Sequence, residues 1–207
     1  AGEAFARRGL MRLGALCLLC LLLGQPGAAA AARGGRVAAA RPPAGPGAAS
    51  WIVVHASTGE LLESREPDRP GPPASMTKMM LALLTLEAVR DGQLAWRDSI
   101  RVSRLASKMG GSQVYLKEGE AFPVEELLGA LLIGSANDAA VALAERLHGS
   151  VEGTVRRMNE RAAALKLSQT RFGSVHGLPP GPGQAADVTT PRDMARLCQA
   201  LLEHPIV

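Results

Sequence analysis

Residues 76 to 90, with the sequence MTKMMLALLTLEAVR, constrain the fold more than any other stretch of the chain. Leucine, methionine and alanine dominate this stretch, and these residues favour a helix. Apolar side chains lie on nearly every face of that helix, so it should be a buried central helix. Asp91 and Gly92 follow as a stop signal. The other elements of the fold must therefore cover this helix.

A β-hairpin is predicted before the central helix. The apolar, β-branched run WIVV at 51–54 is followed by the turn residues STG at 57–59 and a second short apolar stretch at 61–62. Two such runs around turn chemistry are typical of a hairpin. The next segment, REPDRPGPP, holds four prolines and cannot continue a strand, so it is predicted to be a loop.

Further helices are expected in the second half of the chain. Three stretches fit the helical period, and they lie at 124–133, from 138 to Gly149, and at 151–165. The polar break GSAN, at 134–137, separates the first two. Thr190 followed by Pro191 is the typical N-cap and N1 pair of another helix near the C-terminal end.

The net charge of +4 is unevenly distributed along the 207 residues. Residues 1–50 contain six arginines and one glutamate, a charge of +5, whereas residues 51–207 contain 17 Lys and Arg against 18 Asp and Glu, a charge of −1. Nucleic-acid-binding domains carry a basic face. The part expected to fold is close to neutral, so no nucleic-acid partner is predicted.

The N-terminal part is built like a secretory signal peptide. Arginines at 7, 8 and 12 precede the uncharged run LGALCLLCLLL at 13–23, and an alanine tract at 28–32 offers Ala-x-Ala cleavage sites. We predict a signal peptide over 1–32, with Met11 as an alternative start. Eleven apolar residues are few for a hydrocarbon core of roughly 30 Å, and an uncleaved anchor is the alternative.

The rest of the chain divides into a flexible Ala/Gly/Pro-rich linker at 33–49 and a folded domain at 50–207. The signal peptide predicts an exported protein, in the periplasm or at the outer face of the cytoplasmic membrane. Cys17 and Cys20 lie in the signal segment, so Cys198 is the single thiol of the mature domain and no intramolecular disulfide is expected. We predict neither a metal nor another cofactor, because the four histidines lack metal-ligand spacing.

Ser75 and Lys78 lie three residues apart at the start of the predicted central helix. Residues i and i+3 share a helix face, so the hydroxyl and the amine can come within reach, as a nucleophile and its base require. Burial and the positive end of a helix both lower a lysine pKa, which a neutral base needs. The alternative is that Ser75 is only an N-cap. That motif favours Glu or Gln three residues later, whereas the helix dipole repels Lys78.

Ser135 and Asn137 form a second candidate pair, in the polar break between two apolar helices. A hydroxyl and a carboxamide in such a loop can relay a proton and bind a substrate amide. The alternative is a helix–helix turn in which Ser135 or Asn137 is the N-cap of the second helix. Taken alone, this pattern favours the turn.

Over residues 50–205 the chain resembles the D-alanyl-D-alanine carboxypeptidases, the low-molecular-mass penicillin-binding proteins of serine peptidase group S11. The segments that carry the resemblance, in order, are ASMTKMM, GSQVYLKEGE, LLIGSANDAAVALAE, MNERAAAL, TRF and HGL. The resemblance implies the β-lactamase/DD-peptidase-like transpeptidase fold. This is an α/β (α+β) architecture with helices packed on an antiparallel sheet.

In that family the serine of S-x-x-K is acylated by the penultimate D-alanine, terminal D-alanine leaves, and water releases the shortened peptide. By resemblance, Ser75 is the acyl-enzyme nucleophile and Lys78 its general base. Ser135 is a proton relay and Asn137 binds the substrate amide. Ala136 stands where the family usually has glycine, a change that removes no functional group. The implied partners are peptidoglycan stem peptides ending in D-Ala-D-Ala and β-lactam antibiotics.

The family's third motif, K-T-G on a strand beside the active site, does not occur in residues 139–207. In the family that strand supplies a cation for the substrate carboxylate and the second backbone N–H of the oxyanion hole. We therefore expect a partial catalytic domain whose C-terminal strands are missing, with membrane association through a missing C-terminal segment. A non-catalytic module that binds peptidoglycan or β-lactams is the alternative.

A class A β-lactamase is a further alternative, because it shares the S-x-x-K motif but needs a glutamate on a later loop. Residues 171–190 contain no glutamate, and Asp187 is their only acid, which argues against efficient β-lactam hydrolysis.

His176, in the HGL segment, is expected to be structural. Tyr115 and Lys117 are expected on the solvated surface.

Overall fold

The computed structural model describes residues 48–204. The predicted signal peptide, 1–32, and almost all of the predicted linker, 33–49, lie outside the described residues. The elements, in order, are β1 (Trp51–Val54), β2 (Leu61–Arg65), the 3-10 turn η1 (Ala74–Thr77), α1 (Lys78–Arg90), β3 (Ser99–Arg101), α2 (Arg104–Ser107), β4 (Ala121–Pro123), α3 (Val124–Ile133), α4 (Asn137–His148), α5 (Val151–Ala164) and α6 (Pro191–Leu202).

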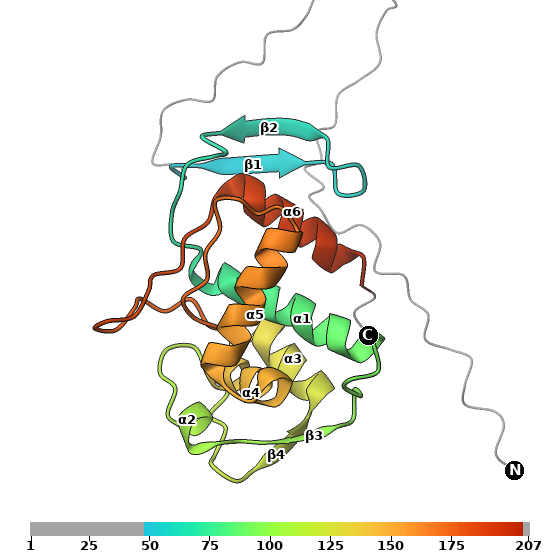
Figure 1. The fold of residues 1–207 in the computed structure, drawn as a ribbon, viewed down its shortest axis with the longest axis vertical. Helices are drawn as coiled ribbons and strands as arrows, with labels where there is room; N and C mark the ends of the chain where they lie inside the picture. Colours follow the sequence, from blue (N-terminus) through green and yellow to red (C-terminus); the bar gives the residue numbers. More distant parts are fainter. Residues whose placement is uncertain (1–47, 205–207) are drawn as a thin grey trace, which may run out of the picture. The chain divides into compact units, whose positions relative to one another are not determined.

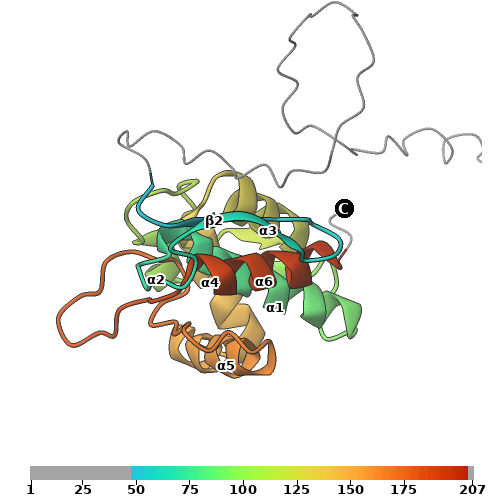
Figure 2. The same ribbon diagram turned by 90° about the horizontal axis from the view of Figure 1, so that it is seen from above.

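Helix α1 is the buried centre of the fold, as predicted (Figure 1). It contacts α3, α4, α5 and α6, and Figure 2 shows α6 running beside it. Met80, Leu81 and Leu83 are fully buried in it. Its first residues differ from the prediction, because the helix was expected from Met76 and the chain instead makes the 3-10 turn η1 before the α-helix begins at Lys78.

The helices around α1 match the predicted positions. Helices α3 and α4 are separated by the short break at 134–136, and α4 ends at Gly149 in the left-handed conformation that favours glycine. The first eight residues of α4 are buried. In α6, the Thr190 hydroxyl accepts from the Asp193 N–H and Pro191 occupies the first turn, so the predicted cap is confirmed.

The described strands form two small antiparallel pairs, β1 with β2 and β3 with β4. The first pair is the predicted hairpin and packs on α6 (Figure 1). Within residues 48–204, β1 has a hydrogen-bonded strand on one side only. An apolar groove of about 660 Å³ lies between β1 and α6 and reaches Met76, next to Ser75. Helices on an antiparallel sheet are the predicted α+β arrangement.

No helix in residues 48–204 is long and apolar enough to cross a membrane.

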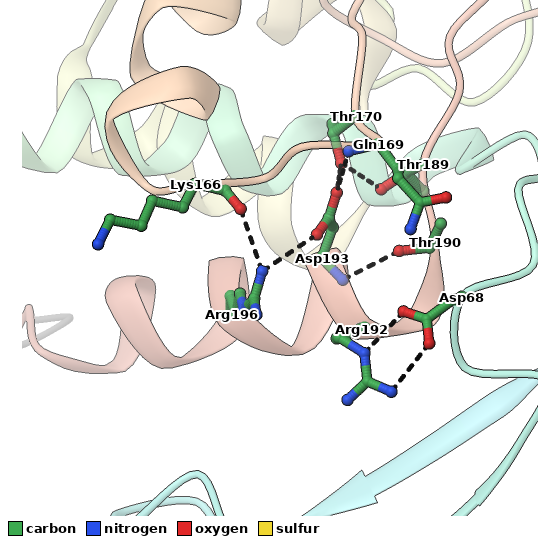
Figure 3. A network of polar contacts seen from close by, with 9 residues as sticks. All are labelled: Asp68, Lys166, Gln169, Thr170, Thr189, Thr190, Arg192, Asp193 and Arg196. Carbon is green, nitrogen blue, oxygen red and sulfur yellow. Dashed lines mark hydrogen bonds and ion pairs between the residues drawn. The ribbon is translucent and has the colours of Figure 1, made fainter.

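The Asp193 carboxylate connects α6 by hydrogen bonds to the segment that follows α5 (Figure 3). This carboxylate is 2% exposed, and Oδ2 accepts from the Gln169 N–H and the Thr170 hydroxyl, both at 2.9 Å. Oδ1 lies 3.6 Å from the Arg196 guanidinium. Nearby, Arg192 of α6 makes a two-pronged ion pair with Asp68 on the loop after β2. Buried donors that lose their acceptor are costly, so Asp193 should matter most in this cluster.

We expect Asp193→Ala to lower the free energy of unfolding by about 1–3 kcal/mol, because it leaves the Gln169 N–H without an acceptor and the Thr170 hydroxyl with only the Thr189 hydroxyl as a partner. Asp193→Asn is the matched control, since its single amide oxygen can still accept both hydrogen bonds. Urea denaturation of both variants tests this. Equal losses in the two variants would contradict the assignment of the effect to these two donors.

Candidate active site

Ser75 and Lys78 meet at the junction of η1 and α1. Lys78 Nζ lies 3.4 Å from Ser75 Oγ. Ser75 lies inside η1, and neither η1 nor α1 has a side-chain cap, so the capping alternative for Ser75 is wrong. The residue before it, Ala74, has a φ of 50°, a left-handed conformation that costs free energy in a non-glycine residue. The serine is exposed and the lysine is buried, which suits a nucleophile and its base.

The Lys78 amine is buried without an acidic partner among residues 48–204. The residue is 3% exposed, and its amine donates to Ser75 Oγ, to Ser135 Oγ and to the backbone carbonyl of His176. None of these acceptors carries a charge, and no carboxylate in the described residues pairs with the amine. Burial lowers the pKa of Lys78 from 10.5 to about 8. A substantial fraction of the amine is therefore neutral at mildly alkaline pH.

Ser135 brings a second hydroxyl to the same amine, at 3.3 Å from Lys78 Nζ. It lies in the break between α3 and α4 and has a φ of 53°. The cap position of α4 is Ala136, with no side-chain cap, so neither Ser135 nor Asn137 is the N-cap that the alternative required. The structure therefore brings Ser75, Lys78 and Ser135 together.

Asn137 is 1% exposed and has a free acceptor. Its Nδ2 donates to the Gly110 carbonyl at 2.7 Å, and this fixes the orientation of the amide because a carbonyl only accepts. Its Oδ1 has no hydrogen-bond partner in the described part of the chain. A buried, unpaired oxygen is unfavourable unless a water molecule or a ligand supplies a donor. Within the described residues Asn137 makes no hydrogen bond to Lys78, and its Oδ1 is a separate acceptor two positions after Ser135.

The segment at 110–116 is held against the start of α4. The Asn137 N–H donates to the Ser112 carbonyl, and the Asp138 carboxylate accepts from the N–H groups of Val114 and Leu116. Gly111 has a φ of 77°, and a Cβ there would lie 2.8 Å from Asn137 Nδ2. Only glycine fits this position without strain. Residues 110 and 111 thus fix the Nδ2 side of the Asn137 amide.

The surface predictions for this segment agree with the structure. Tyr115 is 77% exposed and Lys117 is exposed.

No group of three or more His, Cys, Asp or Glu side chains in residues 48–204 could hold a metal ion.

His176 and Gly177 belong to the site, although the sequence predicts only a structural loop at this position. The His176 carbonyl accepts from Lys78 Nζ at 2.8 Å. Gly177 has a φ of 80°, and a Cβ there would overlap the Ala74 carbonyl. The His176 ring accepts from the Leu178 N–H at Nδ1, and burial followed by the charge of Lys78 lowers its pKa. The loop therefore acts through its backbone.

The chain is similar in sequence to proteins of one known family. The family model for Peptidase_S11, D-alanyl-D-alanine carboxypeptidase, matches residues 37–206. D-alanyl-D-alanine carboxypeptidase DacF of Bacillus subtilis is 38% identical over 157 residues, which are 76% of this chain and 39% of DacF. The chain thus spans about two fifths of the length of this relative.

Solved structures show the same fold. The D-alanyl-D-alanine carboxypeptidase from Mycobacterium tuberculosis H37Rv superimposes with a TM-score of 0.72 at 32% identity, over 82% of this chain and 61% of that one. Penicillin-binding protein D2 from Listeria monocytogenes in its ampicillin-bound form gives 0.67 at 32% identity, over 75% and 62%. With the family model matching most of its length, the chain belongs to the D-alanyl-D-alanine carboxypeptidase family, Peptidase_S11.

Proposed function

We propose that the protein is an exported serine D-alanyl-D-alanine carboxypeptidase that removes the terminal D-alanine of peptidoglycan pentapeptides. One observation carries the proposal: the buried amine of Lys78, without an acidic partner in residues 48–204, lies between the hydroxyls of Ser75 and Ser135 at 3.4 and 3.3 Å. The proposal concerns the protein at its full natural length, because this chain spans 39% of DacF.

The chemistry follows from these three groups. Neutral Lys78 takes the proton of Ser75 Oγ, which attacks the carbonyl carbon of the penultimate D-alanine. Ser135 relays that proton from Lys78 to the nitrogen of the leaving D-alanine. The C–N bond breaks and an ester on Ser75 remains. Water then attacks the ester, Lys78 takes a proton from the water, and Ser75 Oγ recovers its proton as the shortened peptide leaves.

Asn137 fits the role of the amide-binding residue. Its unpaired Oδ1 accepts a hydrogen bond, and a peptide N–H or the side-chain N–H of a penicillin donates one. The ampicillin-bound and cefotaxime-bound structures of the Listeria relative support β-lactams as further partners.

The remaining part of the site is expected on a K-T-G strand. This strand would add the second oxyanion donor, and loss of one such donor costs on the order of 10²–10³ in rate. We also propose export and a location outside the cytoplasmic membrane, on the basis of residues 1–32.

A class A β-lactamase is a weaker proposal for this site. The only acid in residues 171–190 is Asp187, which is 8% exposed and accepts three hydrogen bonds inside its own loop. It does not replace the glutamate that activates the deacylating water in class A enzymes.

Covalent labelling tests the nucleophile. The protein at its full natural length should form an adduct with a fluorescent penicillin, and Ser75→Ala should abolish it because the attacking oxygen is gone. Ser57→Ala, an exposed serine in the hairpin turn, is the control and should label normally. Absence of an adduct in the wild type would reject serine acylation. D-Alanine release from a pentapeptide then separates an enzyme from a non-catalytic binding module.

The pH dependence of acylation tests the base. Only neutral Lys78 accepts the proton, and burial lowers its pKa to about 8. The acylation rate constant should therefore rise about tenfold per pH unit below this value and level off above it. Lys78→Arg should lower the rate by ~10² or more, because arginine stays protonated. A rate that rises only above about pH 10 would contradict a buried, neutral base.

A further inference from the structure

The shortest hydrogen bond of the Lys78 amine goes to the loop after α5. Lys78 Nζ lies 2.8 Å from the His176 carbonyl, compared with 3.4 and 3.3 Å from the two serine hydroxyls. The direction of the amine is therefore set by a backbone carbonyl 98 positions along the chain. The next residue, Gly177, lies directly against the Ala74 carbonyl, one residue before Ser75. The backbone at 176–177 thus contacts both the base and the turn that carries the nucleophile.

Ser174 holds that backbone in place. Its Oγ accepts from the Gly177 N–H at 2.8 Å and from the His176 N–H at 3.4 Å. Its own hydrogen is donated to Asp187 Oδ2 at 2.7 Å. A hydroxyl has one hydrogen and two lone pairs, so the Ser174 hydroxyl makes all three of the hydrogen bonds that it can make.

Asp187 fixes the direction of the Ser174 hydroxyl. Its other oxygen, Oδ1, accepts from the N–H groups of Gly173 and Ser174 at 2.7 and 3.0 Å. An ionised carboxylate only accepts, so the hydroxyl must point its hydrogen at Asp187 and its lone pairs at 176–177. No cationic side chain in the described residues pairs with Asp187. All three hydrogen bonds that the Asp187 carboxylate accepts come from Gly173 and Ser174 of the same loop.

We propose that Ser174 and Asp187 are positioning residues for the Lys78 base: Asp187 orients the Ser174 hydroxyl, which fixes the backbone whose carbonyl holds the Lys78 amine. Within the described residues, neither side chain is hydrogen-bonded to Lys78 Nζ or Ser75 Oγ. This inference rests on the proposed acylation of Ser75. Because misplacing a reacting group by about 1 Å costs on the order of 10²-fold in rate, loss of either residue should slow acylation about 10- to 100-fold.

The test separates penicillin binding from the acylation step in stopped-flow labelling of the full-length protein. Ser174→Ala should lower the acylation rate constant and leave the non-covalent dissociation constant unchanged, since Asn137 and its loop are untouched. Asp187→Asn should act in the same way, because no orientation of its amide both accepts from the two backbone N–H groups and accepts from the hydroxyl. The double variant should be no slower than Ser174→Ala, because the two residues act in series.

Asp193→Ala is the matched control for general loosening. Asp193 is also a buried carboxylate that accepts from a backbone N–H and a hydroxyl, but its partners are Gln169 and Thr170, at the start of the segment after α5 (Figure 3). In the described part of the chain, neither of these partners is hydrogen-bonded to Lys78 or to residues 174–177. Asp193→Ala should lower the melting temperature without changing the acylation rate constant. Wild-type rates in Ser174→Ala and Asp187→Asn, additive rates in the double variant, or equal slowing in Asp193→Ala would each overturn the inference. A wild type that fails to label would instead overturn the proposed function, and this inference with it.

Discussion

Burial of the Lys78 amine is the constraint on which the site depends. A cation taken out of water without a counter-ion is costly, so the amine must either lose its proton or be surrounded by acceptors. Both happen here: burial lowers its pKa to about 8, and three uncharged oxygens surround it. Those oxygens come from three distant parts of the chain. The largely apolar helix α1 supplies the buried position, and η1, the break between α3 and α4, and the loop after α5 each supply one acceptor.

Bringing the two serines to one amine requires unfavourable backbone. Ala74 and Ser135 both have a positive φ, and each such residue costs on the order of 1–3 kcal/mol. Packing offsets this cost, because α1 and the first two turns of α4 are almost wholly buried. Gly177 makes the turn at Ala74 possible by leaving room for its carbonyl. The rigid helices thus hold two strained turns in the one arrangement that lets Lys78 reach both hydroxyls.

Hydrophobic periodicity and turn chemistry were sufficient to predict the hairpin, the central helix, the break before α4 and the Thr190 cap, because these features are local. The pairing of Ser75 with Lys78 was also predictable, since residues three apart share a helix face. The capping alternatives failed because η1 and Ala136 displaced the helix starts from the expected residues. The role of His176 was not predictable, because it acts through its carbonyl and contacts Lys78 across 98 positions. A backbone acceptor leaves no residue-type signal in the sequence.

The same loop also bears on how the acyl-enzyme would be resolved. A separate base for the deacylating water would have to lie near the ester, and Asp187 is the only acid of its loop. Three of its roughly four lone-pair positions are occupied, and the side chain is buried. With Asp187 engaged in orienting Ser174, the loop supplies no second base. In the proposed mechanism, Lys78 is then the base of both half-reactions, which fits a peptidase that β-lactams trap as an ester better than an enzyme that hydrolyses them rapidly.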